Sequence, residues 1–543
     1  MRNFMRLLIA GTLLALTACS QPAAIVPTRT PTVHPTLVPT LGNASSQYFS
    51  QEYFNQANAL IRSGNYQGAI DELSSVISLN YDPLTTAFAY YQRARIYLTL
   101  NQTPAALRDL DQSIALNRDF LEAYQMRALI YNGAQNYAQA LPDYDRIVEL
   151  DPQNSASYYQ RGILYETTGQ YPKAIDDFTQ TLKLASDKPT VLVARGATYF
   201  HMNQLVQALG DLTLAIQQNP ALATAYYYRG QVNMGLNKPQ EAIADFSQAI
   251  RLSPDGADTY RMRGIVYYQQ GQYDLALSDL SHLLVLSPDS ISGLFYRAYT
   301  YDALGKDPAA LTDLNRLLSL DPQYTSAYLV RALIYQRSVQ FDQALADYNQ
   351  AIALVPGALE YNDRGDCYLE SGKNDLAMAD FNQAISIDAT YALAYLNRGR
   401  VYTNLGQYPQ ALDDFNHVIG LDPNNFQVFL YRGLAYNNQG NYKNAVADLT
   451  KAIGLAPDNA QAYLVRGTIQ FVNRDNQDAL TDLTKAIGLA PDAPEEYLYR
   501  GEVYHSLGNT NAAIADFKQV LALNPSDSLR TQAQNQLDQL SGK

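Results

Sequence analysis

The stretch Tyr395–Pro423, YLNRGRVYTNLGQYPQALDDFNHVIGLDP, decides the fold, because the chain repeats this pattern from Gln51 almost to its end. Each copy can be anchored on an Arg-Gly or Arg-Ala pair. Thirteen anchors follow one another at steps of 34 residues, with one step of 33. They are Arg93, Arg127, Arg161, Arg195, Arg229, Arg263, Arg297, Arg331, Arg364, Arg398, Arg432, Arg466 and Arg500. Gln56 takes the arginine's place in one more copy upstream, which makes fourteen.

Positions counted from the anchor predict two short antiparallel helices in each copy. Offsets −3, +1 and +4 hold an aromatic residue or Leu, a Gly or Ala, and usually Tyr, which together form one helical stripe. Gly or Asn commonly stands at +8, where a helix end needs a left-handed residue. Ala stands at +13 in all fourteen copies, a large apolar residue at +17, and Pro at +25 in ten copies. The small residues at +1 and +13 allow the two helices to approach closely.

An acidic residue stands sixteen positions after every anchor, and it is Asp after each of the thirteen arginines. The anchor lies eight residues before the turn and the acid lies eight residues after it. Residues equidistant from the turn of an antiparallel helix pair face each other. We therefore predict an Arg–Asp pair inside each copy, such as Arg398 with Asp414. The alternative, a track of free arginines for an anionic ligand, is disfavoured by the matched aspartates.

The pattern resembles the tetratricopeptide repeat, with its W-x2-L-G-x2-Y, A-x3-F and P signature at a period of 34. Here Tyr replaces Trp and Arg replaces Leu, and the resemblance covers about 485 residues. It implies an all-α solenoid, a right-handed superhelix of about fourteen helix pairs with a concave groove that binds peptides or protein segments. Pro142 inside a second helix, and Val339 and Arg474 at the turn position, depart from the pattern. The tail Ser526–Leu540 is expected to form a cap helix.

The N-terminus reads as a secretory leader. Met1–Arg6 carries two positive charges, and Leu7–Leu16 is apolar but too short to cross a bilayer. The sequence Leu16-Thr17-Ala18-Cys19 resembles the bacterial lipobox, which implies cleavage before Cys19 and acylation of that cysteine. A Pro- and Thr-rich segment follows, and such a composition is typical of an extended tether.

These patterns divide the chain into four parts. We expect a lipoprotein signal peptide at 1–18, a flexible tether at 19–47, the solenoid at 48–525, and a cap helix with tail at 526–543. A lipid-anchored location on the extracytoplasmic face of a bacterial cell membrane or outer membrane follows from the first two.

Composition argues against catalysis and against nucleic acid as a partner. The net charge of −13 makes the chain a poor counterion for phosphate backbones. No HExxH, GxSxG, P-loop or CxxC motif occurs, and the five His residues are scattered. We expect no metal, no cofactor and no enzymatic activity. Cys367 is expected to be a small buried thiol.

The variable stripe of the first helix lies at offsets −5, −2, +2, +5 and +6, and in the tetratricopeptide family this face resembles the groove that holds ligands. It is rich in aromatic residues up to Tyr299, and Leu prevails at offset −2 afterwards. The candidate protein-binding residues are Tyr91, Tyr159, Tyr227, Tyr268, Phe295, Tyr299, Arg337, Asp366 and Arg400. The alternative for these side chains is packing against the next repeat. Arg337 and Arg400 are expected near Asp366 and Glu370.

Two functions remain open from the sequence. The first is a membrane-anchored scaffold that binds protein partners or peptide segments in the groove. The second is a receptor for a glycan or small molecule that uses the groove tyrosines.

Overall fold

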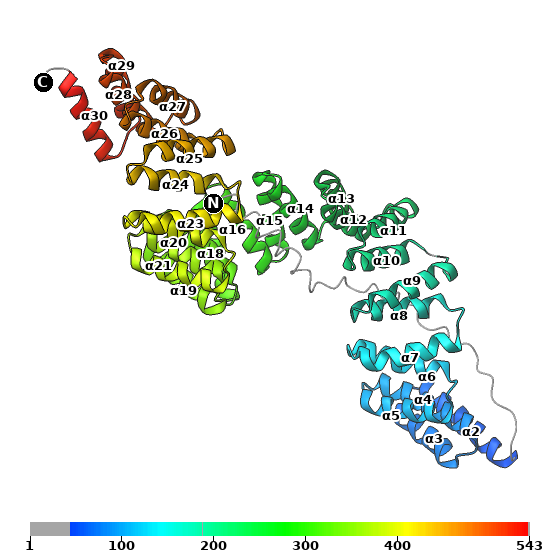
Figure 1. Cartoon of the computed structure of the whole chain (residues 1–543). Helices are drawn as coiled ribbons and strands as arrows, with labels where there is room; N and C mark the ends of the chain where they lie inside the picture. The colour runs from blue at the N-terminus through cyan, green and yellow to red at the C-terminus, as the bar shows by residue number, and fades with distance from the viewer. Residues whose placement is uncertain (1–43, 187, 541–543) are drawn as a thin grey trace. The chain divides into compact units, whose positions relative to one another are not determined.

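The computed structural model describes residues 44–186 and 188–540, and within these residues it contains 29 helices, α2 to α30, and no strand (Figure 1). The prediction of an all-α repeat solenoid is confirmed. The helices fall into two compact units, one ending at Gln204 and one beginning at Leu205, and each is described by itself. The predicted leader and Cys19 lie outside the described residues, as does most of the predicted tether.

The helices of the first unit form consecutive pairs, in which α2 packs on α3, α4 on α5, α6 on α7 and α8 on α9. Each pair also packs on the next through its second helix. The bounds are α2 Ala44–Arg62, α3 Tyr66–Leu79, α4 Pro83–Thr99, α5 Thr103–Leu116, α6 Leu121–Gly133, α7 Tyr137–Leu150, α8 Ser155–Thr167, α9 Tyr171–Leu184 and α10 Pro189–His201.

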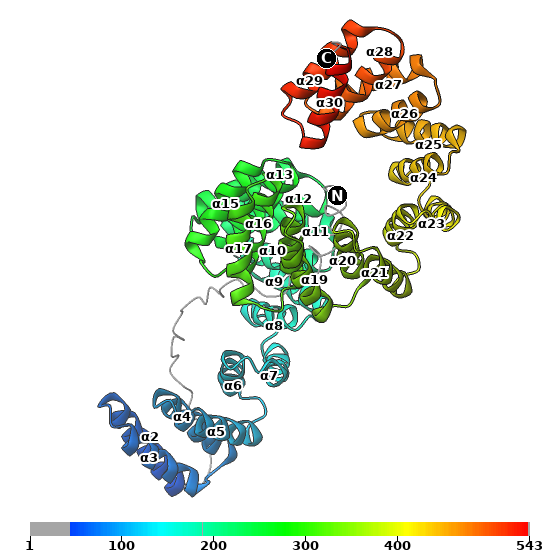
Figure 2. The same ribbon diagram turned by 90° about the vertical axis from the view of Figure 1, so that its left-hand side faces the viewer.

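The second unit continues the same order from the second helix α11, with pairs from α12/α13 to α28/α29. The succession from α24 to α27 is clear in both views (Figures 1 and 2). The bounds are α11 Leu205–Gln218, α12 Ala223–Gly235, α13 Pro239–Leu252, α14 Ala257–Gln269, α15 Tyr273–Leu286, α16 Ile291–Ala303, α17 Asp307–Leu320, α18 Thr325–Arg337, α19 Phe341–Leu354, α20 Ala358–Glu370, α21 Asn374–Ile387, α22 Ala392–Asn404, α23 Tyr408–Leu421, α24 Phe426–Asn438, α25 Tyr442–Leu455, α26 Ala460–Val472, α27 Asn476–Leu489, α28 Pro494–Ser506, α29 Thr510–Ala522 and α30 Asp527–Leu540.

The turn inside each pair is left-handed at offset +8, as predicted. Gly406 has φ 72°, and every other copy also has a positive φ at this position. Val339 and Arg474 adopt the same conformation with φ of 60° and 69°, so their turns are not distorted. A β-branched residue is strained in this region of φ/ψ space, so Val339 costs stability where Gly would not.

The close approach of the two helices depends on the pairing of offsets +1 and +17. A Cβ atom placed on Gly399 would lie 2.6 Å from Cε1 of Phe415. Wherever Phe stands at +17, Gly stands at +1, while the Tyr of α7 and of α19 faces an Ala. The small residue therefore makes room for the ring that fills the centre of the pair.

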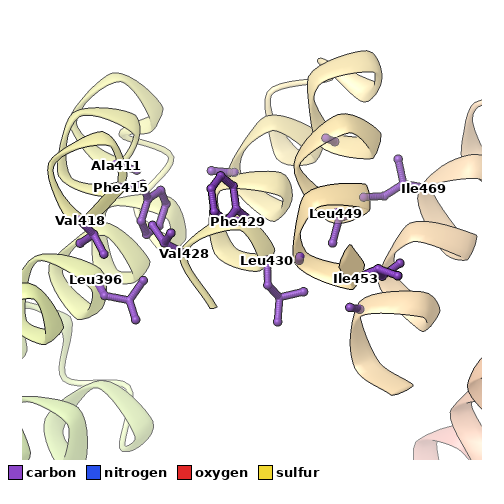
Figure 3. Packing of buried hydrophobic residues seen from close by; sticks show 14 residues of the cluster. Leu396, Ala411, Phe415, Val418, Val428, Phe429, Leu430, Leu449, Ile453 and Ile469 are labelled. Atoms are coloured by element: carbon purple, nitrogen blue, oxygen red, sulfur yellow. The ribbon is translucent and has the colours of Figure 1, made fainter. Parts of the chain in front are cut away.

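The core is continuous between neighbouring repeats. In Figure 3, Phe415 of α23 lies beside Val428 of α24, and Leu449 of α25 lies in the same cluster near Ile469 of α26. The exposed fraction of each of these side chains is at most 2%. Each pair thus buries its apolar face only by contact with the next, which is the property that makes a repeat array stable.

Irregular spacing is absorbed at the ends of helices. The 33-residue step leaves a loop of three residues, Val355 to Gly357, between α19 and α20. The step from Gln56 to Arg93 is three residues longer than 34. The added length lies at the start of α4, which has 17 residues. Pro142 lies inside α7, and α7 runs through it from Tyr137 to Leu150.

Both ends of the repeat array differ from its middle. Helix α2 begins at Ala44, so the helical part starts four residues before the predicted boundary at 48. At the other end α30 packs on α29 and α28, and it buries Ala533 and Leu537 against Phe517. No helix within 44–186 and 188–540 combines the length and the apolar character needed to cross a bilayer.

Candidate functional site

The anchor arginines form two-pronged ion pairs with the aspartates of their own repeat, as predicted. In twelve repeats Nε and Nη2 of the arginine donate to the two carboxylate oxygens at 2.6–3.0 Å. The hydrogen bond that Arg398 donates to Asp414 raises the pKa of Arg398 above its ordinary value. These arginines are therefore structural groups.

A third bond of the arginine links neighbouring repeats, and the sequence analysis missed it. Nη1 of Arg398 donates to Asn382 of the preceding repeat at 2.7 Å. In eleven repeats the acceptor stands at offset +18 of the repeat before, and it is always Ser, Thr, Asn or Asp. The signal was a run of small polar acceptors at this offset. The last repeat, which no anchor arginine follows, has the exposed Lys518 there.

Tyrosines enclose the guanidinium from both sides. The guanidinium carbon of Arg398 lies 5.3 Å from the ring of Tyr395 and 5.9 Å from the ring of Tyr402. Most repeats have one or both of these contacts at offsets −3 and +4. A planar cation between two aromatic faces is favourable, which explains why Tyr recurs at these positions in a chain that contains 43 Tyr and no Trp.

The first helices of successive repeats lie next to one another within each unit, so their variable stripes join into a surface. Such contacts link α8 with α10 in the first unit and α12, α14, α16 and α18 in the second. They also link α20, α22, α24, α26, α28 and finally α30. We call this the first-helix surface. All nine predicted binding residues belong to first helices. Their part in binding stays a prediction.

In the first unit the predicted aromatic residues pack in two different ways. Tyr91 lies 4.9 Å from Phe120 and 6.3 Å from Phe88, ring centre to ring centre. Burial raises its pKa. Tyr159 instead packs at 5.8 Å on Phe178 of its own repeat.

In the second unit three of the four predicted aromatic residues gather on α14 and α16. The ring of Tyr299 lies 5.1 Å from Tyr268 and 6.1 Å from Phe295. Phe295 and Tyr299 are only 7% and 5% exposed. Tyr227 is separate and packs on Phe246, and burial raises its pKa to about 12. The rings thus pack both within a repeat, as Tyr227 does, and between repeats, as Tyr268 and Tyr299 do.

The predicted charges separate into two ion pairs. Arg400 donates to Asp366 at 2.9 Å and its guanidinium lies 5.1 Å from the ring of Tyr431. Arg337 donates to Asp302 and Asp307 at 2.7 and 2.6 Å. The expectation that Arg337 lies near Asp366 and Glu370 is wrong, because its side chain turns towards the preceding repeat.

Gln336, rather than Arg337, contacts the acidic residues of α20. It donates to Glu370 at 2.8 Å and accepts a hydrogen bond of 2.9 Å from the hydroxyl of Tyr348. Tyr348 is fully buried at offset +17, where most repeats have Phe or Leu, so its hydroxyl requires a buried acceptor. The sequence signal for this network was the hydroxyl at an otherwise apolar position.

A cleft of about 360 Å³ lies on the first-helix surface at the C-terminal end. Its lining consists of Ala460, Gln461, Leu464, Ala493, Pro494, Glu495, Glu496 and Leu529, from α26, α28 and α30 and the residue before α28. These positions include offsets −5 and −2 of the predicted stripe. The cleft is therefore a hollow within the predicted binding face.

Glu496 gives this cleft its charge. Six of the fourteen copies have a buried Ala at offset −4, whereas Glu496 is a carboxylate that is 5% exposed. Its Oε2 atom has no hydrogen-bond partner among the described residues. Burial raises the pKa of Glu496, and the neighbouring Glu495 adds to this effect. A buried carboxylate with one oxygen that has no hydrogen-bond partner, beside apolar walls, suits a cationic group on an aliphatic stem.

No constellation for metal chemistry occurs among the described residues, where no group of three His, Cys, Asp or Glu side chains converges. Cys367 is a buried free thiol, and burial raises its pKa to about 12. The prediction of a small buried thiol is confirmed. A thiol with a raised pKa has little nucleophilic thiolate at neutral pH.

Repeated helix pairs whose first helices lie side by side within each unit define a helical-repeat protein of the class that mediates protein–protein interaction. The chain belongs to the tetratricopeptide repeat family. Models described as tetratricopeptide repeat match residues 128–197 and 467–538, 91–155 and 261–325, 392–425, and 428–459. A TPR repeat model matches 236–271 and 365–406. Proteins of this family are generally non-enzymatic scaffolds.

Individual proteins resemble the chain only in part. A curated relative, the DnaJ homolog subfamily C member 7 homolog of Schizosaccharomyces pombe, is 36% identical over 69 residues, which are 12% of this chain and 14% of that protein. Cut9 with Hcn1 of the APC/C is similar with a TM-score of 0.40 and 14% identity, covering 85% of this chain and 96% of that one. Yeast Tom70 is similar with a TM-score of 0.37 and 15% identity, covering 79% of this chain and 97% of that one.

Proposed function

We propose that the protein is a lipid-anchored scaffold on the extracytoplasmic face of a bacterial membrane, and that it binds a segment of a protein partner along the first-helix surface. The proposal for the anchor rests on the leader and the lipobox-like sequence at Cys19. The proposal for the binding mode rests on the C-terminal cleft, which is lined by Leu464, Leu529 and Glu496, and on the Oε2 atom of Glu496, which has no hydrogen-bond partner among the described residues.

The chemistry of the cleft favours a segment that presents Lys or Arg. Its stem would pack on the apolar walls and its cation would reach Oε2 of Glu496, which has no hydrogen-bond partner among the residues described. Peptide-binding grooves read segments by such pockets for single side chains. The rest of the first-helix surface would then provide complementarity over a longer segment.

The alternative, a receptor that stacks glycans on groove tyrosines, requires exposed ring faces. Tyr299 is almost fully buried against neighbouring rings, and the other four predicted tyrosines are half-buried. We therefore favour the protein scaffold.

Site-specific crosslinking tests the binding mode. A photo-crosslinking amino acid is placed at Gln461, which is exposed and lines the cleft, or at the exposed Lys485 of the second helix α27 as a control. We expect a discrete partner band in native membranes from position 461 and none from 485, and we expect Glu496→Gln to weaken it. Equal bands from both positions would contradict groove binding.

Fractionation tests the anchor independently. Cys19→Ala removes the acylated side chain, so we expect the protein to leave the membrane fraction while its folded repeats persist. If the Cys19→Ala protein stays with the membrane, the lipid anchor is refuted.

A further inference from the structure

Helix α12 lacks an aromatic ring that most first helices carry. Tyr stands four residues after the anchor in eleven of the fourteen copies, whereas α12 has Asn233 there. A cleft of about 320 Å³ lies beside Asn233. It is separate from the first-helix surface, because none of its lining residues stands at a variable offset of a first helix. The absence of the ring thus coincides with an open space.

Residues of three helices and one turn enclose this cleft. They are Leu209 and Thr213 of α11, Arg229 and Asn233 of α12, Lys238 of the turn, and Glu241, Ala244 and Asp245 of α13. The amide of Asn233 donates to Asp245 at 2.9 Å. This bond holds the short side chain of Asn233 against α13.

The walls of the cleft correspond to the surroundings of a tyrosine ring elsewhere in the chain. The hydroxyl of Tyr165 donates to Asp145 at 3.2 Å, and its ring lies 5.6 Å from the guanidinium carbon of Arg161 and 5.1 Å from Nζ of Lys173.

By repeat position, the counterparts of these three neighbours are Thr213, Arg229 and Glu241, and all three line the cleft. Lys238 corresponds to Lys373, whose Nζ lies 6.0 Å from the ring of Tyr368. Glu241 thus stands where the repeat of Tyr165 has Lys173, and Lys238 supplies a cation from the turn instead.

Arg229 keeps its pair but not its bond to the preceding repeat. Its Nε and Nη2 donate to Asp245 at 2.9 and 2.6 Å. Between the described residues Arg229 and Thr213 there is no hydrogen bond, whereas Arg263 donates to the equivalent Ser247 at 2.9 Å. A guanidinium and a hydroxyl therefore both border the cleft without being joined to each other.

We propose that this cleft is a binding site for a phenol ring, which takes the place of the absent tyrosine side chain. The ring face lies against the cations of Arg229 and Lys238, and the ring hydroxyl lies at Thr213. The space suffices, because a cavity of about 150 Å³ already holds benzene in a protein interior. The phenol is either a free small molecule or the side chain of a tyrosine in a protein segment.

Titration of the full chain with 4-fluorophenol, followed by fluorine NMR, tests the proposal. We expect saturable binding by the unaltered protein and at least tenfold weaker binding by Asn233→Tyr, whose own ring fills the cleft. Asn233→Tyr is also expected to raise the unfolding temperature. Gln470→Tyr, the matched change at offset +4 of α26, should leave binding unchanged.

A second variant keeps the test informative if the Asn233→Tyr protein does not fold. Thr213→Val keeps the shape of the cleft and removes the hydroxyl, so it should weaken the binding of 4-fluorophenol but not that of 4-fluorotoluene. Absence of saturable binding by the unaltered protein overturns the proposal, as does undiminished binding by a folded Asn233→Tyr protein.

Competition identifies the source of the ring. Displacement of 4-fluorophenol by free phenol alone indicates a small-molecule ligand. Displacement by a tyrosine-containing peptide, but not by the same peptide with Ala in place of Tyr, indicates a protein segment.

Discussion

Arg398 donates through Nε and Nη2 to both carboxylate oxygens of Asp414, at 2.8 and 2.7 Å, across the two helices of one repeat. The exposed fractions of the two side chains are 19% and 8%. Because the same guanidinium also reaches Asn382 of the preceding repeat, the pair fixes the helices of one repeat and joins them to the next. Charged groups used in this way specify register.

Removal of the carboxylate leaves the arginine partly buried and unpaired. We expect Asp414→Ala to lower the free energy of unfolding by about 3 kcal/mol, measured by urea titration together with amide hydrogen exchange in α22 and α23. Asp413→Ala, at the exposed neighbouring position, is the control and should change stability by less than about 0.5 kcal/mol. Equal effects of the two variants would show that the pair contributes nothing.

The close contact of Gly399 with Phe415 predicts a cost for one added methyl group. A Cβ at position 399 would meet ring atoms at 2.6 to 3.0 Å, so we expect Gly399→Ala to destabilise the protein by about 1–3 kcal/mol. Gly420 is also helical, and nothing lies within 4 Å of an added Cβ there. Gly420→Ala should therefore stabilise by up to about 1 kcal/mol. Thermal unfolding of both variants provides the comparison, and a stabilised Gly399→Ala protein would contradict the packing.

The left-handed turn at Val339 predicts an opportunity to stabilise the fold. We expect Val339→Gly to raise the free energy of unfolding by about 1 kcal/mol, because Gly adopts a φ of 60° without steric strain. The reciprocal change Gly406→Val, at a turn with φ 72°, should lower it by a similar amount. Chemical denaturation of the pair of variants tests whether the signs are opposite.

Asp363 predicts a dependence of stability on pH. Burial raises its pKa to about 7, and the nearby carboxylates of Asp366 and Glu360 act in the same direction. The pKa of this carboxyl in the unfolded chain is about 3.9. Between this pKa and that of the folded chain, the folded chain holds a proton that the unfolded chain has released. Its contribution is fully present below about pH 4 and is lost as the pH rises through about 7.

Asp363→Asn removes this titration, so we expect the unfolding midpoint of the variant to vary less between pH 4 and pH 7 than that of the unaltered protein. Asp388→Asn is the control. Hydrogen bonds from Thr390 lower the pKa of Asp388, so its contribution is lost only as the pH falls below about 4. A parallel change in both variants would argue against the assignment.

The contacts within a repeat could be predicted from the sequence, and most contacts between repeats could not. Arg398 and Asp414 face each other because they are equidistant from one short turn, and that symmetry is visible in the spacing. The partner of Arg337 depends instead on how far one repeat is staggered against the next. A period of 34 residues does not fix that stagger, so Asp302 and Asp307 were missed as partners.

The candidate site shows the same division. The stripe containing Leu464 was predicted from its offset. The cleft beside Glu496 also depends on the packing of α30 and on a Glu at a buried position where six other copies have Ala. The cleft at Asn233 was missed for a different reason. It results from the absence of a tyrosine at position 233. The repeat pattern was defined by the residues that the copies share, so it did not mark a position where one of them is absent.

The bond that eleven of the thirteen arginines make to the preceding repeat allows the chain to grow by whole repeats. Duplication or loss of one 34-residue unit by recombination within the gene would preserve every such bond on both sides of the junction. Copy number could therefore drift during evolution without the need for compensating mutations. Lys518 would disfavour a further unit after the last repeat, because the arginine of that unit would meet a positive charge there in place of an acceptor.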